Sequence, residues 1–262
     1  MEHSLLFLGT AAYDFSPKLE GECRDRFDND ARRASCALLD GHILIDCGPH
    51  LLDSLRIARI SASAIDTVLF THLHCDHFQK SSLSALAEGR EHPLAVYAHT
   101  DAGNTLLEVP GIAFSPLPFE TPVGIAAGMT VTALPANHDS GSFPEHLLFE
   151  SRDGKRFYYA TDGGWILNSA YAHLRERGTL SLLVMDGTVG DYEGDYRAGE
   201  HNSIPMVRLL LKSFETVKII DTETKVYITH IAPTLHAPHE QTEKIMSAIG
   251  AHTAAAGLLV KY

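Results

Sequence analysis

Residues 71–77 read Thr-His-Leu-His-Cys-Asp-His and form an H-x-H-x-D-H pattern. The run before this segment is apolar and β-branched, so we expect it to be a strand. Alternate residues of an extended chain point to the same side, so His72 and His74 can reach one metal ion together. Asp76 and His77, where we expect the chain to turn into a helix, can reach a second ion. Imidazole and carboxylate groups are suitable ligands for Zn²⁺, Mn²⁺ or Fe²⁺.

Short β-rich runs alternate with runs of helical periodicity along the rest of the chain. The alternation predicts strands over 4–9, 35–39, 42–46, 67–70, 94–97, 129–134, 146–150, 156–160, 181–185, 225–229 and 257–260. Helical periodicity predicts helices over 51–60, 166–177, 203–214 and 239–249. The Asp40-Gly41 pair favours a tight hairpin turn between the second and third strands. Strands with helices outside them, in two halves, indicate a layered α/β architecture.

Residues of the metal-ligand type recur at or just past the ends of predicted strands: His72, His138, Asp162, Asp186 and His230. Functional residues are expected on loops that a rigid sheet holds in place. Taken singly, His138, Asp162 and His230 are about as consistent with structural roles as with metal ligation. For Asp186, support of the ligands and simple turn formation are equally open.

In their order, these residues resemble the metallo-β-lactamase superfamily. Its hallmark is an H-x-H-x-D-H loop after a strand, with three further ligands downstream at strand ends. The downstream matches are His138, Asp162 and His230, and Asp46 matches an early aspartate that buttresses the metal loop. The resemblance implies an α/β fold, a four-layered αββα sandwich, formed by residues 1–262 as a single domain.

The resemblance also implies two divalent metal ions, zinc or manganese, with iron as a further candidate. Three histidines would hold one ion: His72, His74 and His138. A mixed set would hold the other: Asp76, His77 and His230. Asp162 would bridge the ions, and Cys75 is not counted as a ligand. Such a pair of ions turns water into a hydroxide nucleophile at neutral pH, which Asp76 could orient as a catalytic residue.

Within the superfamily, the chain most resembles the phosphoribosyl 1,2-cyclic phosphate phosphodiesterase group. The similarity lies in four segments: 7–10, 32–36, 45–49 and 199–203. The last resembles the segment that supplies a histidine near the scissile phosphate, so His201 is a candidate general acid or phosphate contact. The alternative is that His201 is a residue at a helix N-terminus, with Asn202 or Ser203 capping the helix. The implied activity is hydrolysis of a small cyclic or nucleotide-like phosphodiester.

The chain departs from that group in the region where relatives bind a separate structural zinc ion. Relatives often carry a cysteine cluster after the first strand that binds a structural zinc, whereas residues 17–30 contain only Cys23. Pro233 stands three residues beyond His230, where such a relative can supply a fourth ligand. We therefore expect no structural zinc, and a related enzyme with a different small substrate stays open.

Composition and charge limit the classes of substrate and the cellular compartment that we expect. The formal net charge is −12, and no basic stripe is present, which argues against a long nucleic-acid partner but not against a small anionic substrate. Ribonuclease Z shares the ligand set but carries a basic, glycine-rich arm that this chain lacks. The apolar run at residues 5–8 is too short for a signal peptide or a membrane span, and four irregularly spaced cysteines favour a cytoplasmic protein. A homodimer would be ordinary for the family.

Two other functions stay open at this point. A lactonase or thioesterase could use the same ligands to attack a carbonyl group. A non-catalytic metal-binding or ligand-binding protein would be expected to lose an orienting or bridging carboxylate, yet Asp76 and Asp162 are present. Flavodiiron oxidoreductases replace the second loop histidine with glutamate, whereas His74 is intact. Trp165, close in sequence to Asp162, could line a pocket, but it is expected to pack in the core.

Overall fold

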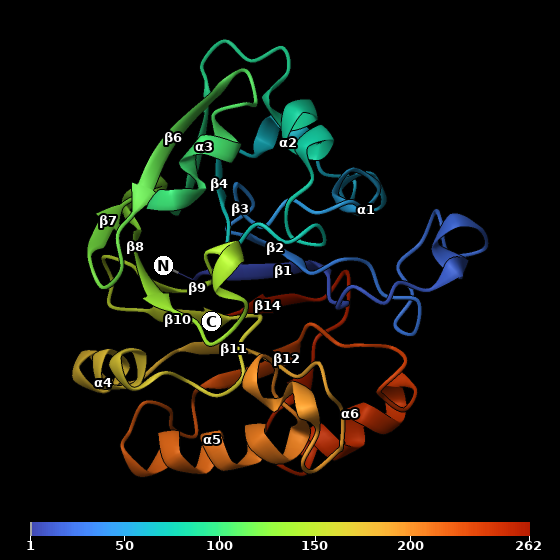
Figure 1. The fold of residues 1–262 in the computed structure, drawn as a ribbon, viewed down its shortest axis with the longest axis vertical. Coiled ribbons are helices and arrows are strands. Elements are labelled where there is room, and N and C mark those ends of the chain that lie inside the picture. Colours follow the sequence, from blue (N-terminus) through green and yellow to red (C-terminus); the bar gives the residue numbers. More distant parts are fainter. Residues whose placement is uncertain (1) are drawn as a thin grey trace.

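Consecutive apolar residues fill most of the strands, which is the pattern expected of sheets covered on both faces. In β10 (Arg156–Ala160), every residue after the first is buried. The computed structural model, which describes residues 2–262, places this strand in one of two seven-stranded sheets. The sheets pack face to face, and helices cover both outer faces (Figure 1). The predicted αββα sandwich is therefore confirmed.

The order of strands in each sheet explains how distant segments meet. The first sheet contains β14 (Leu259–Lys261), β1 (Ser4–Gly9), β2 (Cys36–Leu39), β3 (Ile43–Ile45), β4 (Thr67–Leu69), β5 (Leu94–His99) and β6 (Ile112–Leu117). The second contains β13 (His252–Thr253), β12 (Lys225–Thr229), β11 (Leu182–Asp186), β10, β9 (Glu145–Glu150), β8 (Thr130–Pro135) and β7 (Pro122–Gly124). β3 to β6 run parallel to one another, as do β10 to β13.

Helices form the two outer layers. The first sheet is covered by α1 (Leu51–Ala58), α2 (Lys80–Ala87) and α3 (Gly103–Leu106). The second is covered by α4 (Asn168–Arg177), α5 (Ile204–Thr216) and α6 (His239–Ser247). Short 3₁₀ helices lie at Pro17–Glu20, Ala62–Ala64, Thr100–Ala102, Ala126–Gly128, Ser140–Ser142 and Tyr196–Gly199. No helix within residues 2–262 is long and apolar enough to cross a membrane.

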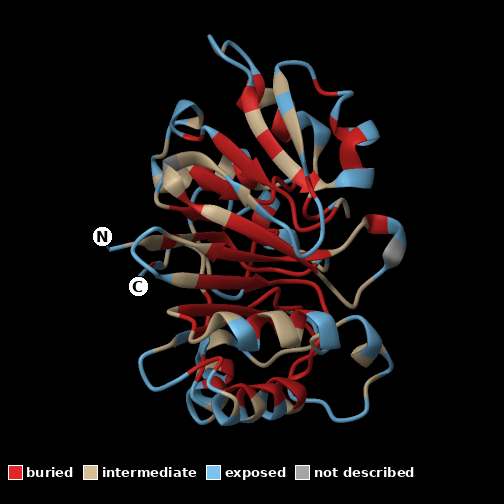
Figure 2. Ribbon diagram, turned by 90° about the vertical axis from the view of Figure 1, so that its left-hand side faces the viewer, coloured by how far each residue is buried: buried red, intermediate tan, exposed pale blue. Residues whose placement is uncertain are grey.

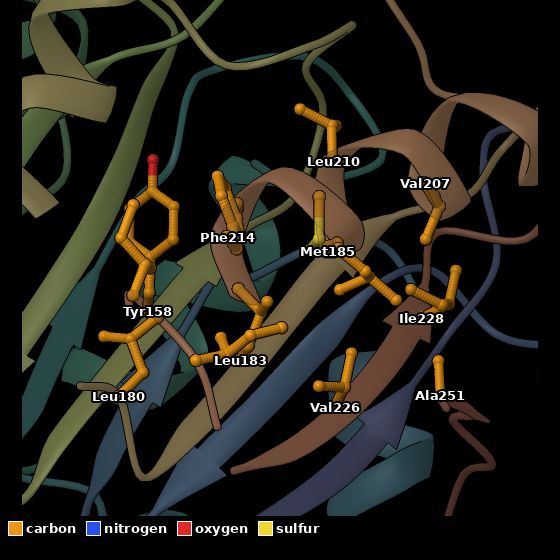
Figure 3. Packing of buried hydrophobic residues seen from close by; sticks show 14 of the residues in the cluster. Tyr158, Leu180, Leu183, Met185, Val207, Leu210, Phe214, Val226, Ile228 and Ala251 are labelled. Carbon is orange, nitrogen blue, oxygen red and sulfur yellow. The ribbon is translucent and has the colours of Figure 1, made fainter. Parts of the chain in front are cut away.

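Alternation along each strand divides the core into layers. In β10, Phe157 and Tyr159 face the other sheet, whereas Tyr158 faces the helices. Figure 3 shows this outer layer, in which Tyr158 and its sheet neighbours pack against Val207 and Phe214 of α5. The strands are buried along most of their length, while the helices expose their outer sides (Figure 2). The sheets are therefore the rigid part of the molecule, on which the loops are mounted.

Sequence periodicity located most of these elements. The bounds of β1, β10 and β12 are as predicted. The hairpin between β2 and β3 turns at Asp40 (φ 50°) and Gly41 (φ 78°), which confirms the tight turn with two positive φ angles. The helix expected to begin at Asp76 and His77 begins only at Lys80, as α2, and α3, β6, β7 and β13 were not predicted. Serines interrupt the apolar pattern of α2, and β6 contains Pro116, which an edge strand tolerates.

Trp165 contradicts its predicted place in the core. Its side chain is 40% exposed, and its backbone is left-handed with φ 62°. The residue lies on the loop between β10 and α4, where its N–H donates to Asn202 Oδ1 at 2.8 Å. The loop is thus fixed through its backbone, and the indole is left at the surface.

Two adjacent arginines stabilise the long loop between β1 and β2 through hydrogen bonds. Arg33 is 2% exposed and donates to the carbonyl groups of Cys23, Arg24 and Arg26. Arg32 donates to Thr10 Oγ1, the carbonyl of Ala254 and His239 Nδ1. Burial lowers the pKa of Arg32 to about 10. These two adjacent arginines therefore lie inside the molecule and do not form a basic patch on its surface.

Glu145, at the start of β9, is a buried carboxyl group between the sheets. It is 1% exposed, and neither side-chain oxygen has a hydrogen-bond partner within the described residues. Burial, with a smaller contribution from Asp46, raises the pKa of Glu145 well above its ordinary value. In the folded protein this carboxyl group keeps its proton at pH values where it is ionised in the unfolded chain.

Replacing Glu145 by Gln should therefore change how stability depends on pH. A raised folded-state pKa contributes stability below the unfolded pKa of about 4.3 and loses it as the pH rises toward the folded value. The melting temperature of Glu145→Gln should exceed that of the wild type by more at pH 8 than at pH 5. Glu223→Gln, at an exposed position, is the control. A difference between Glu145→Gln and wild type that does not vary with pH would contradict this account.

Candidate metal centre

The residues singled out by the sequence meet at one edge of the sandwich because parallel strands end on the same side. β3 and β4 run parallel in the first sheet and are followed by Asp46 and residues 71–77. β10, β11 and β12 run parallel in the second sheet. β11 ends at Asp186, and β10 and β12 are followed by Asp162 and His230. Each sheet thus contributes one half of the candidate site.

Three of these residues have left-handed backbones, namely Asp46 (φ 64°), Asp162 (φ 56°) and His230 (φ 56°). Residues with a Cβ rarely adopt this conformation, which costs about 1 kcal/mol or more at each position. All three are buried at the ends of rigid strands, so packing holds them there. The side chains of Asp162 and His230 meet, with His230 Nδ1 2.7 Å from Asp162 Oδ1, whereas the carboxylate of Asp46 contacts His77 Nδ1.

The first ligand cluster consists of three histidines and a carboxylate: His72, His74, His138 and Asp162. One ligand atom from each lies within 4.8 Å of the others. His72 Nε2 is 3.0 Å from Asp162 Oδ2, and His138 Nε2 is 3.1 Å from His74 Nδ1. The spacing in the H-x-H segment thus brings His72 and His74 to one point, as the sequence predicted.

The second cluster consists of Asp76, His77, Asp162 and His230. His77 Nε2 lies 3.0 Å from Asp162 Oδ2 and 3.2 Å from His230 Nε2. Asp76 Oδ2 is 3.4 Å from His230 Nε2 and 3.5 Å from His77 Nε2. Asp162 belongs to both clusters, which is the position that a bridging ligand must occupy.

Some buried atoms of the two clusters lack a hydrogen-bond partner in the protein and are suited to contact a cation. His72 Nε2 and Asp162 Oδ1 are buried and have no hydrogen-bond partner of acceptable geometry among the described residues. Burial, reinforced by neighbouring His77, lowers the pKa of His72 to about 3, so its imidazole is neutral at physiological pH. A neutral imidazole and a carboxylate that point into the same space form a donor set for a divalent metal ion.

The electrostatics of the second cluster also favour a cation. Burial lowers the pKa of His77, but Asp76, Asp46 and Asp162 outweigh burial and raise that pKa well above its ordinary value. Burial similarly raises the pKa of Asp162, yet His230 and His77 hold it well below its usual range. The carboxylates thus draw protons onto the neighbouring histidines, and a divalent ion would take the place of those protons.

Asp46 supports the metal loop from behind, in the place that the resemblance implies. It is 0% exposed, and its Oδ2 lies 2.8 Å from His77 Nδ1, which leaves His77 Nε2 to face the cluster. Thr71 donates its N–H and its hydroxyl group to the same carboxylate. A carboxylate behind a ligating histidine fixes the ring and raises its basicity.

His201 enters the site from the segment between β11 and α5. Its Nδ1 is 3.1 Å from Asp186 Oδ2 and 3.6 Å from Asp162 Oδ1, so it lies beside the ligand clusters. Asp186 also accepts from the N–H of Asn202 and from the hydroxyl group of Thr188. Burial lowers the pKa of His201, but Asp186 and Asp162 outweigh it and raise the pKa. Asp186 therefore stabilises the backbone at Thr188 and Asn202 and also orients the imidazole of His201.

Neither Asn202 nor Ser203 caps α5 with its side chain. Ser203 stands at the N-cap of α5 but makes no side-chain capping bond. The side chain of Asn202 instead accepts from the N–H of Trp165 and donates to the carbonyl of Gly163. It therefore ties the segment that carries His201 to the loop that follows β10.

A cavity of about 440 Å³ opens over both clusters. Its walls include residues that the sequence did not single out: Ala12, Tyr13, Asp14, Thr188, Arg197, Glu200, Ala232, Thr234 and Leu235. Cys75 also lines it and is exposed. These residues come from loops without periodicity, so no sequence signal marked them. The exception is Thr188, two residues beyond a predicted strand end.

Comparison with known proteins agrees with this arrangement. Residues 42–253 match the family described as the β-lactamase superfamily domain. No curated protein matches the chain significantly.

Solved structures with similar folds span the whole chain. A diphosphatase from the PhnP family is 20% identical with a TM-score of 0.76, covering 100% of this chain and 98% of its own. YhfI from Bacillus subtilis is 15% identical with a TM-score of 0.77, covering 100% and 99%. Zinc-bound PqqB from Methylobacterium extorquens is 18% identical with a TM-score of 0.73, covering 98% and 99%. At such identities the likeness concerns the fold.

The metal loop passes so close to the turn after β3 that Gly48→Ala should disturb it. A Cβ at Gly48 would lie 1.9 Å from the carbonyl oxygen of Asp76. We expect a loss of about 2 kcal/mol or more in the free energy of unfolding, because backbone must move. Denaturant unfolding of the metal-free protein measures this loss. Gly124→Ala, where a Cβ would meet open space, is the control. Equal stability of the two variants would show that the loop can shift freely.

Proposed function

The chain belongs to the β-lactamase superfamily, and from this premise we propose that it is a metal-dependent hydrolase that cleaves a small phosphodiester. The observation that supports the proposal best is the pair of ligand clusters that share Asp162 at the floor of an open cavity. A protein that only binds a metal has no need of a cavity that reaches both clusters.

Two divalent ions are proposed, held by the ligands that the sequence indicated. His72, His74 and His138 would hold one, Asp76, His77 and His230 the other, and Asp162 both. The mixture of imidazole and carboxylate suits zinc or manganese, with iron as a further candidate. Such a pair of ions supplies an activated water molecule near neutral pH and stabilises charge on the attacked group.

Asp76 and His201 are the side chains to which we assign catalytic roles. Asp76 lines the cavity, where its carboxylate can accept a hydrogen bond from the attacking water and orient it. His201 also lines the cavity, and because Asp186 holds its Nδ1, Nε2 is left to donate a proton to the leaving oxygen. Acid assistance matters when the leaving group is an alkoxide, since an alkoxide is a strong base.

Charge favours phosphate over an uncharged ester as the substrate. Among the described residues, four carboxylates line the cavity, from Asp14, Asp76, Asp162 and Glu200, against the single guanidinium of Arg197. Two divalent ions would make the balance positive, which favours an anion. The diphosphatase of similar fold acts, by its name, on a phosphate compound. A lactonase or thioesterase is the alternative, because its substrate needs the same nucleophile.

Metal-loaded protein should cleave bis-p-nitrophenyl phosphate with zinc or manganese. Asp76→Ala should abolish turnover. His201→Ala should lower kcat by about 10²- to 10⁴-fold, the usual contribution of a general acid, on a phosphodiester with an alkoxide leaving group, and by much less on bis-p-nitrophenyl phosphate, whose p-nitrophenolate leaves without a proton. His252→Ala removes an exposed histidine on β13 and serves as the control. Activity confined to lactones or thioesters would contradict the phosphodiesterase and leave a hydrolase. A loaded protein that turns over none of these esters would favour a binding protein.

Metal content gives a separate test of the ligand set. Chelator-treated protein should take up two zinc ions per chain, measured by elemental analysis after gel filtration. His74→Ala should remove one ion, because His74 belongs only to the first cluster. Asp162→Ala should weaken both, because Asp162 belongs to both clusters. A single ion in the wild type, or unchanged content in Asp162→Ala, would contradict the shared site.

A further inference from the structure

A second cavity shares a wall with the metal cavity. Its volume is about 270 Å³, and its lining consists of Asp30, Arg32, Ile231, Pro233, His236, Ala237, Pro238 and His239. The shared wall is the segment that follows the proposed ligand His230. Within it, Ala232, Thr234 and Leu235 line the metal cavity, whereas Ile231, Pro233 and His236 line the second cavity. No residue that lines the second cavity belongs to a ligand cluster.

Arg32 brings a buried positive charge to the second cavity. It is 3% exposed, and all its hydrogen bonds go to uncharged groups. Nη1 donates to Thr10 Oγ1 at 2.8 Å and to the carbonyl of Ala254 at 2.7 Å, and Nη2 donates to His239 Nδ1 at 2.8 Å. Within the described part of the chain no carboxylate pairs with Arg32, and Asp30 acts on it only at longer range. A buried charge costs several kcal/mol unless an opposite charge compensates it.

Two of the five N–H groups of this guanidinium have no partner. The three hydrogen bonds use both N–H groups of Nη1 and one of Nη2. Nε–H and the second N–H of Nη2 therefore make no hydrogen bond with the described residues. Because Arg32 lines the cavity, these donors are open to a ligand there. Guanidinium N–H groups form strong, charge-assisted hydrogen bonds with oxyanions.

His239 adds a further donor to the cavity. Because a guanidinium can only donate, His239 Nδ1 accepts the bond from Arg32, and the proton of this neutral imidazole is on Nε2. Burial, reinforced by Arg32, lowers the pKa of His239, in agreement with a neutral ring. Nε2–H makes no hydrogen bond with the residues that the structure describes. His236 is held elsewhere, since its Nε2 donates to the carbonyl of Gly187 at 2.7 Å.

Asp30 is the only carboxylate among the described residues that line this cavity, and its charge opposes an anion. Its Oδ1 accepts from the N–H of His239 at 2.8 Å, at the first residue of α6. Asp30 is exposed, so water and salt screen its charge, whereas the charge of Arg32 is buried. The less screened charge at this cavity is therefore positive.

We propose that the second cavity binds a free inorganic oxyanion of the phosphate or sulfate type, with Arg32 and His239 as its donors. The cavity volume of about 270 Å³ is several times the roughly 30 Å³ of one water molecule in the liquid, so such an ion fits together with some water. The ion would connect the loop before β2, which carries Arg32, to the start of α6. It would take no part in the reaction at the metal clusters.

Calorimetric titration of the zinc-loaded protein with sodium sulfate, with chloride keeping the ionic strength constant, tests the site. Sulfate on the metal ions is common to all the variants compared, so differences between them report the second cavity. Arg32→Gln should weaken binding there about tenfold or more, as expected for a hydrogen bond to a charged group. Arg33→Gln removes the other buried arginine of this loop, which does not line the cavity, and should leave the affinity within about twofold.

Asp30→Asn tests the same site in the opposite direction. Removing the opposing charge should strengthen sulfate binding about two- to fivefold, the range expected for an exposed charge nearby. Asp25→Asn makes the same change of charge at a residue that pairs with Arg56 outside the cavity, and it should have little effect. The comparison of these two variants decides the matter if Arg32→Gln fails to fold.

The position of the ion is tested in crystals of the zinc-loaded protein soaked in selenate, whose selenium is located by anomalous scattering. Selenium beside Arg32 in the wild type and in Asp30→Asn supports the site. Absence of selenium there, or a sulfate affinity that neither Arg32→Gln nor Asp30→Asn alters, overturns it. These outcomes do not depend on what the protein hydrolyses.

Discussion

The site depends on one buried carboxylate at the junction of the two sheets. Asp162 is 2% exposed, and its oxygens lie 3.0 Å from His72 and His77 nitrogens and 2.7 Å from His230 Nδ1. A buried charge costs several kcal/mol unless opposite charge compensates it. His230 supplies part of that compensation from the same sheet, and His72 and His77 supply the rest across the interface, because they follow β4 whereas Asp162 follows β10. Metal affinity and the packing of the two halves are therefore linked.

Several strained or closely packed backbone positions lie at this junction. Asp46, Asp162 and His230 all adopt left-handed backbones at strand ends, and Gly48 allows a close approach that a Cβ would block. Strained conformations persist only where the surroundings over-determine them. Here the surroundings are two sheets buried on both faces, so the apolar core supplies the rigidity that the polar edge requires.

The sequence predicted the parts of the molecule that local spacing determines. Strands with alternating or continuous apolar residues were located well, and the candidate ligands were indicated by the H-x-H-x-D-H spacing and by positions just past strand ends. The cavity wall was not predicted, since Asp14 and Arg197 come from loops whose meeting depends on the packed fold. Trp165 was misplaced for the same reason, because the burial of a lone aromatic in a loop is set by tertiary contacts.

Charge explains how an acidic protein can select an anionic ligand. The overall charge is −12, yet surface charges are screened over about 8 Å at physiological ionic strength. A long polyanion would cover the acidic surface and meet this repulsion, whereas a small anion inside the cavity meets mainly its walls. Those walls are net negative until divalent ions occupy the clusters. The same ions that activate water would thus also create the positive field that admits the substrate.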